Sequence, residues 1–163
     1  MHYFSVCTDQ NSIPIKTKSK LVTVGMERWL NALEACNNIN LIKKTRALNA
    51  DSNFRRLIET IFSYSPFLTR IVISDPAFVC NLFQKGPDRV LNKIFSDIKN
   101  TRKTIPQTTE GTDELASILR RAKRQASLAI AIADISGLWK LAQVTHALSR
   151  LAEISISAST VTN

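Results

Sequence analysis

The sequence predicts an all-α protein, an irregular helical bundle of about seven helices with a long antiparallel C-terminal pair. Apolar residues recur at three- and four-residue spacings from Met26 onward, proline-containing junctions divide the middle of the chain, and no stretch has the alternation and turn-linked partner of a strand. With 163 residues, 44% of them hydrophobic, the chain can form one domain with a buried core. We expect a flexible basic lead-in over residues 1–24, a single helical domain over 25–159 and a tail at 160–163.

The lead-in lacks helical periodicity and contains Pro14 and several spaced lysines, so we interpret it as a frayed terminus or a binding arm. The first helix presents one apolar face, formed by Met26, Trp29, Leu30 and Leu33. A shorter helix is expected over 41–48, and Asp51 or Ser52 can cap the next one by accepting backbone N–H groups. That third helix carries a consistent apolar stripe, formed by Phe54, Leu57, Ile58, Ile61 and Phe62.

Three prolines begin three successive short helices. Ser65-Pro66 and Asp75-Pro76 each place a side-chain oxygen at the N-cap and a proline at the first helical position, where its missing N–H costs nothing. Gly86-Pro87 ends the second of these helices and begins the third. The expected helices are 67–73, 77–83 and 88–100.

Two long helices are expected after a polar connection over residues 101–112. Thr112 or Asp113 is expected to cap the first of them, and Gly137 marks the break between the two. The second helix has an apolar stripe formed by Leu138, Leu141, Val144, Leu148, Leu151 and Ile154.

Composition excludes several classes of protein. Four glycines argue against a glycine-rich phosphate loop, and three widely spaced cysteines suggest neither a disulfide framework nor a zinc site.

The sequence also lacks targeting and membrane segments. It has no basic segment followed by an apolar one, as a signal peptide would have. The most apolar window, 126–139, is too short for a membrane helix and is interrupted by Asp134. We expect a cytoplasmic protein with free thiols and no membrane partner.

The sequence offers no candidate catalytic residue, metal ligand or cofactor site. Phosphoryl and nucleotidyl transfer need at least two carboxylates that converge on Mg²⁺, and the chain has no Asp-x-Asp or Asp-x-Glu. Nothing places a nucleophile near His2 or His146. Asp134 lies in an apolar helix, so we expect it to be buried and paired with Lys140 or with an arginine of the neighbouring helix.

The densest basic run, residues 120–124, has two interpretations. It contacts phosphate or an acidic partner, or it is a solvated helix face with one arginine turned inward to pair with Asp134. The net charge is +9, but the cations are spread over every helix and no aromatic residue interrupts the run. The sequence therefore argues against nucleic acid as a partner.

Particular residues resemble a known family. Ser65-Pro66-Phe67-Leu68, closely followed by Arg70, is similar to an element near the start of the glutamine-synthetase adenylyltransferase/deadenylylase. Later residues follow that enzyme's helical region in order, namely Leu119, Arg120, Arg121, Ile132, Asp134, Ile135, Gly137, Leu138, Val144, Thr145, Leu148, Ser149, Leu151 and Ala152. The resemblance covers roughly Trp29 to Ser157. It implies framework positions and no catalytic ones, at Ser65, Pro66, Phe67, Leu68, Arg120, Arg121, Asp134 and Gly137.

The resemblance implies a role in nitrogen metabolism. The family's enzymes are large and bifunctional, transferring AMP from ATP to a tyrosine of glutamine synthetase and removing it by phosphorolysis as ADP. Both reactions use Mg²⁺, and a PII signalling protein and glutamine select between them. In that family the catalytic Asp motif follows these helices, whereas this chain stops at Asn163.

We therefore expect an N-terminal helical segment that is inactive alone, either a truncated gene product or an excised fragment. The alternatives are a stand-alone helical protein-interaction module and a basic nucleic-acid binder.

Overall fold

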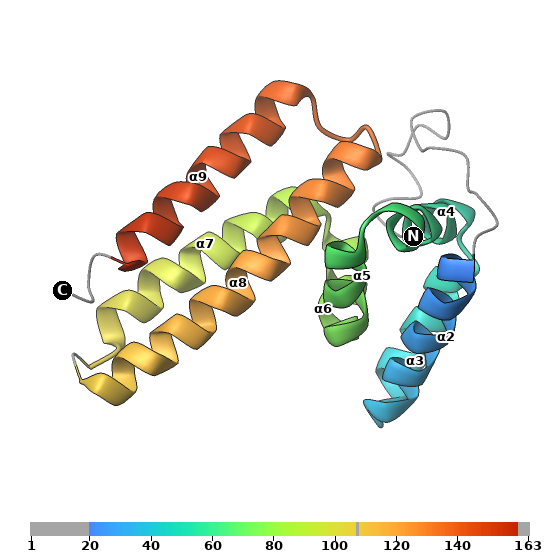
Figure 1. Ribbon diagram of the computed structural model, residues 1–163, viewed down its shortest axis with the longest axis horizontal. Helices are drawn as coiled ribbons and strands as arrows, with labels where there is room; N and C mark the ends of the chain where they lie inside the picture. Colours follow the sequence, from blue (N-terminus) through green and yellow to red (C-terminus); the bar gives the residue numbers. More distant parts are fainter. Residues whose placement is uncertain (1–19, 107, 160–163) are drawn as a thin grey trace.

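A computed structural model describes residues 20–106 and 108–159 of the chain. Eight α-helices and no strand occupy this part, which confirms the all-α prediction (Figure 1). The helices are α2 (Lys20–Ala35), α3 (Ile39–Asn49), α4 (Ser52–Tyr64), α5 (Pro66–Ser74), α6 (Pro76–Lys85), α7 (Pro87–Thr104), α8 (Thr109–Ile135) and α9 (Leu141–Ser159). No helix among the described residues is long and apolar enough to cross a membrane.

The helices fall into two groups joined by the longest one. The long helices α7, α8 and α9 lie alongside one another, whereas α2 to α6 pack as shorter elements at one side (Figure 1). Helix α8 packs against both α7 and α9 and also reaches α5, while α6 packs against α7. The junction between the two groups is therefore formed by α5, α6, α7 and α8.

Side-chain caps explain where the middle helices begin. Asp51 Oδ1 accepts hydrogen bonds from the backbone N–H groups of Asn53 (2.9 Å) and Phe54 (3.1 Å) at the start of α4. Ser65 Oγ accepts one from the Leu68 N–H (3.2 Å) at the start of α5. The predicted Ser-Pro and Asp-Pro junctions are confirmed, and Gly86, with a φ of 82°, separates α6 from α7.

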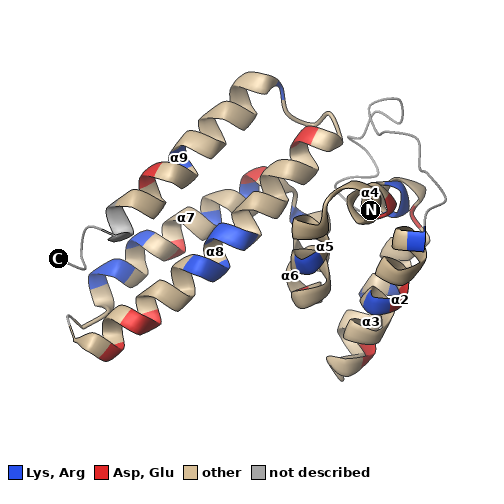
Figure 2. Ribbon diagram, in the orientation of Figure 1, with Lys and Arg blue, Asp and Glu red and all other residues tan. Residues whose placement is uncertain are grey.

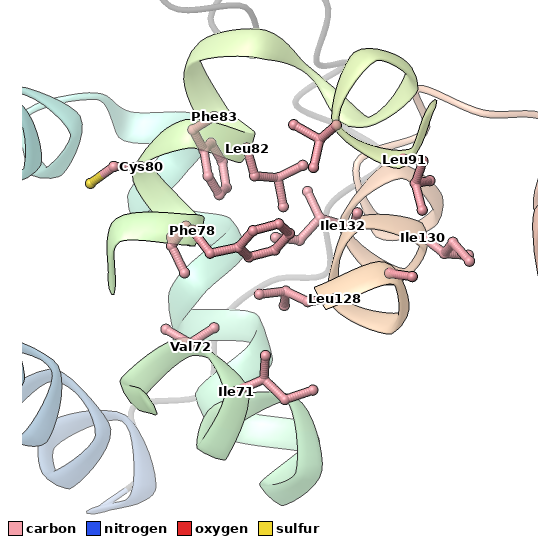
Figure 3. Packing of buried hydrophobic residues seen from close by; sticks show 14 of the residues in the cluster. Ile71, Val72, Phe78, Cys80, Leu82, Phe83, Leu91, Leu128, Ile130 and Ile132 are labelled. Carbon is pink, nitrogen blue, oxygen red and sulfur yellow. The ribbon is translucent and has the colours of Figure 1, made fainter. Parts of the chain in front are cut away.

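One hydrophobic core connects the two groups of helices. The rings of Phe54 and Phe83 meet edge to face, with centroids 4.6 Å apart, which joins α4 to α6. Figure 3 shows the side chain of Phe78 from α6 pointing towards Leu128 and Ile132 of α8. All of these residues are buried, so α8 is anchored to the shorter helices by apolar contacts.

Some predicted boundaries differ from the structure. Helix α2 begins at Lys20, so residues 20–24, which the sequence assigns to the lead-in, are helical; residues 1–19 and 160–163 lie outside the described residues. The connection before α8 is much shorter than 101–112. Neither Thr112 nor Asp113 caps α8, because Thr108 Oγ1 accepts a hydrogen bond from the Gly111 N–H (3.2 Å).

The predicted stripe of α9 is only partly buried. Val144, Ala147 and Leu151 pack into the core, but Leu141 is 79% exposed and Leu148 is 50% exposed. The buried residues follow one line along the face that meets α8, and the two exposed leucines lie together on one side of that line. The apolar surface of α9 is therefore wider than the surface that α8 covers.

Candidate functional site

Asp75 makes three side-chain hydrogen bonds at the junction of the two helix groups. Its Oδ1 accepts a hydrogen bond from the Phe78 N–H (3.2 Å) and so caps α6. Its Oδ2 accepts hydrogen bonds from Gln125 Nε2 (2.8 Å) and Arg121 Nη2 (3.3 Å), both on α8. One carboxylate thus fixes the beginning of α6 to the middle of α8.

A groove of about 510 Å³ opens beside this carboxylate, between α6, α7 and α8. Its floor is apolar, formed by the largely buried side chains of Phe78, Val90 and Ile94. Its charged walls carry four cations and two carboxylates, namely Lys85, Arg89, Lys93, Arg121, Asp75 and Asp97. Figure 2 shows that basic segments of α7 and α8 run beside each other here.

The cations of the groove differ in what they contact. Lys93 Nζ binds both carboxylate oxygens of Asp97, at 3.1 and 2.9 Å, and Arg121 pairs with Asp75. Lys85 and Arg89 make no ion pair within the described part of the chain. The groove therefore keeps an excess of positive charge at the corner where α6 passes into α7.

The framework positions expected from the sequence do not form one site. Ser65 and Pro66 begin α5, Phe67 beside them is 48% exposed, and Leu68 packs against the core. Arg120 is exposed on α8, and Gly137, with a φ of 68°, lies in the turn before α9. Of all these positions, only Arg121 lines the groove.

The expectation for Asp134 is wrong. Asp134 is exposed, and no ion pair involves it in residues 20–106 and 108–159. Its neighbours Ile132 and Ala133 fill the core-facing side of α8, which turns the next position outward. One arginine of the basic run does pair with a carboxylate, but that carboxylate is Asp75, 46 positions away in the sequence.

The sequence predicts only one of the two roles of Asp75. The Asp-Pro pair predicts an N-cap, and the structure confirms that role. The second role depends on α8 crossing the start of α6, which no local pattern of residues predicts. The sequence pattern does not single out Lys85 and Arg89 either, because their role depends on the residues of α8 that line the same groove.

Cys80 has a structural environment. Its side chain is buried, and its Sγ shares a 2.9 Å hydrogen bond with Thr45 Oγ1. Burial raises the pKa of the Cys80 thiol, although the bond to Thr45 and the charge of Lys44 act in the opposite direction. The thiol therefore stays neutral near pH 7, whereas Cys36 is an exposed free cysteine.

The described residues contain no group of three or more His, Cys, Asp or Glu side chains placed to hold a metal ion. The carboxylates nearest the groove already have protein partners, since Asp75 binds α8 and Asp97 binds Lys93. The geometry of this region suits recognition of a negatively charged group through Lys85 and Arg89.

Comparisons with known proteins identify relatives of the chain. A family model described as glutamate-ammonia ligase adenylyltransferase matches residues 54–162. A protein of Rhodopseudomonas palustris (strain TIE-1) named bifunctional glutamine synthetase adenylyltransferase/adenylyl-removing enzyme is 32% identical over 108 residues, which are 66% of this chain and 10% of the relative. The protein of that name from Bradyrhizobium diazoefficiens is 30% identical over 133 residues, 82% of this chain and 13% of the relative.

A third protein of the same name, from Bartonella henselae, is 27% identical over 135 residues, covering 81% of this chain and 13% of the relative. The chain thus spans only 10 to 13% of the length of these relatives. No solved structure gives a significant match to the chain.

Proposed function

The chain belongs to the glutamate-ammonia ligase adenylyltransferase family, and we propose that it serves as a helical framework segment in the enzymatic adenylylation and de-adenylylation of glutamine synthetase. The observation that carries the proposal is the family match over residues 54–162, which spans most of α4, all of α5 to α9 and the whole basic groove. The matched helices share one continuous core, to which α2 and α3 also contribute, rather than forming a set of scattered motifs.

The framework role is non-catalytic. Mg²⁺-dependent nucleotidyl transfer needs carboxylates that are free to hold the metal. In the described region the candidate carboxylates near the groove are bound to Gln125, Arg121 and Lys93, so this set does not fit Mg²⁺. Mg²⁺, ATP and ADP would belong to other parts of a parent enzyme, with glutamine synthetase and a PII signalling protein as its partners in the cytoplasm.

A turnover assay tests the non-catalytic part of the proposal. The chain is incubated with adenylylated glutamine synthetase, phosphate and Mg²⁺, and ADP is measured. We expect no ADP above a control without metal. Formation of ADP that requires both the metal and the chain would contradict the proposal.

A chimera tests the framework role directly. The matching 108-residue segment of the Rhodopseudomonas palustris relative is replaced by that of this chain, and the adenylylation state of glutamine synthetase is followed. We expect activity to be retained, and to fall in a chimera carrying Asp75→Ala but not in one carrying Asp97→Ala. A folded but inactive chimera would show that the segment does not supply the framework.

The second candidate function is a stand-alone helical module that binds a protein. The exposed leucines on α9, Leu141 and Leu148, favour it, because they lie about two turns apart on the same side of the helix and exposed apolar surface often marks an interaction site. Sedimentation of the purified chain distinguishes this candidate. Self-association that Leu141→Ser/Leu148→Ser abolishes would support it, and a monomer at high concentration that binds no hydrophobic dye would count against it.

A nucleic-acid binder is the remaining alternative. Two of the four groove cations are paired with carboxylates, which reduces the charge available to phosphates. Binding of DNA at low salt, with a steep loss as salt is raised, would favour this alternative.

A further inference from the structure

We propose that the groove between α6, α7 and α8 binds an acidic helix of a partner protein through Lys85 and Arg89. The inference goes beyond the framework role, because it gives this surface a ligand of its own. The chimera described above can remain active whether or not the groove binds such a helix. An inactive chimera would therefore contradict the framework role, whereas absence of peptide binding would contradict only the present proposal.

The charge of the groove indicates an anionic ligand. Lys85 and Arg89 have no carboxylate partner among the described residues, and the groove is also lined by the uncharged amide of Asn81. Arg121 uses one terminal nitrogen for Asp75, and a guanidinium carries five N–H donors in all. The surface can therefore bind further carboxylates without breaking the interactions that hold α8 to α6.

The openness of the walls indicates a macromolecule rather than a small anion. The side chains of Arg121 and Lys93 are 66% and 68% exposed, so a small ligand between them would remain largely hydrated. Pockets for small molecules usually enclose most of the ligand surface. A helix laid over the groove would instead cover these side chains and strengthen each charge interaction by excluding water.

The spacing of the cations matches a helix. Arg89, which is unpaired, and Lys93, which already binds Asp97, are one helical turn apart on α7, which corresponds to about 6 Å along the axis. Carboxylates at positions i and i+4 of a partner helix have the same separation. The apolar floor of the groove, formed by α6 and α7, can contact small side chains of the partner helix. Amphipathic helices bind to apolar grooves in this way in other complexes.

The test uses a fluorescein-labelled helical peptide with glutamates four residues apart, and a control peptide with glutamines in their place. We expect the acidic peptide to bind the full chain and the glutamine peptide to bind far more weakly. Amide NMR shifts should gather on the helices that line the groove. No binding of the acidic peptide at about 1 mM, or equal binding of both peptides, would overturn the proposal.

Matched variants locate the binding to the groove. Lys85→Glu/Arg89→Glu should weaken the acidic peptide about tenfold, because two exposed attractions become repulsions. Arg28→Glu/Lys43→Glu makes the same change of charge on exposed positions of α2 and α3, and should alter affinity less than about twofold. Equal losses in both variants would show that only net charge matters and would overturn the proposal.

Three further measurements keep the test decisive. Lys85→Gln/Arg89→Gln removes the charge without reversing it, so an intermediate loss of affinity is expected even if the glutamate variant folds poorly. Circular dichroism checks that each variant is folded. A single-stranded oligonucleotide is titrated in parallel, and groove-dependent binding tighter than that of the acidic peptide would assign the surface to phosphates and overturn the proposal.

Discussion

Replacing Asp75 by alanine removes three hydrogen bonds, one that caps α6 and two that join the start of α6 to α8. The variant loses the cap on the Phe78 N–H and the acceptor for Gln125 and Arg121. Loss of an N-cap costs about 1 kcal/mol. The hydrogen bond from Gln125 contributes about 1 kcal/mol. The pair with Arg121 contributes about 0.5 kcal/mol, because the arginine is two-thirds exposed.

We therefore expect Asp75→Ala to lower the free energy of unfolding by about 2–3 kcal/mol. Asp75→Asn separates the two roles, because asparagine is as good an N-cap as aspartate. When its oxygen caps the Phe78 N–H, its amide nitrogen replaces Oδ2 and can accept from neither Gln125 nor Arg121. Its expected cost is about 1–1.5 kcal/mol. The difference between the two variants measures the cap.

Urea unfolding followed by circular dichroism measures these changes. Asp97→Ala is the matched control, since it makes the same substitution at an exposed helical carboxylate that is also ion-paired. Its effect should stay within about 0.5 kcal/mol, because the lost pair is offset by the higher helix propensity of alanine. Equal effects of Asp75→Ala and Asp97→Ala would refute the assignment of Asp75 as the link between α6 and α8.

Four further changes follow from the structure and are measured by the same unfolding experiment. Gly111→Ala should cost about 1–3 kcal/mol although alanine favours helices, because the new Cβ would collide with the Pro106 carbonyl oxygen; an unchanged midpoint would contradict this. Gly137→Ala should cost about 1 kcal/mol, because the φ of 68° is unfavourable for any residue with a Cβ. Asp134→Asn should change stability by less than about 0.5 kcal/mol, whereas breaking a buried ion pair would cost several times more. Because burial raises the pKa of the Cys80 thiol, the native state keeps this proton to a higher pH than the unfolded state does; stability should therefore fall as pH rises through the ordinary thiol range, and Cys80→Ala should flatten that fall.

The elements could be predicted from the sequence wherever a local signal sets them. The starts of α4, α5 and α6 depend on a capping side chain within three residues, and these were predicted correctly. The start of α8 was not, because Gly111 looked like part of a loop. Its missing side chain instead lets the first turn of α8 approach the Pro106 carbonyl, a close contact that depends on how α7 ends.

Interactions between distant segments could not be predicted in this way. The apolar surroundings of Asp134 in the sequence suggested burial, but a helix buries one side only, and a single residue of offset turned the carboxylate to solvent. Arg121 could be recognised as one of several basic residues, yet its partner Asp75 lies on another helix. Which of the neighbouring arginines binds Asp75 depends on where α8 passes the start of α6.

The basic groove and the outer side of α9 differ in what they require of a partner. The groove has a largely buried apolar floor and two unpaired cations, so the part of its attraction that depends on charge should weaken as salt is raised. The exposed leucines of α9 carry no charge, and their attraction should persist in high salt. Salt dependence therefore distinguishes the two surfaces in any complex of this chain. A complex that survives high salt and is lost in Leu141→Ser/Leu148→Ser uses α9. Charge reversal at Lys85 and Arg89 should leave such a complex intact, because these residues lie in the groove and not on α9.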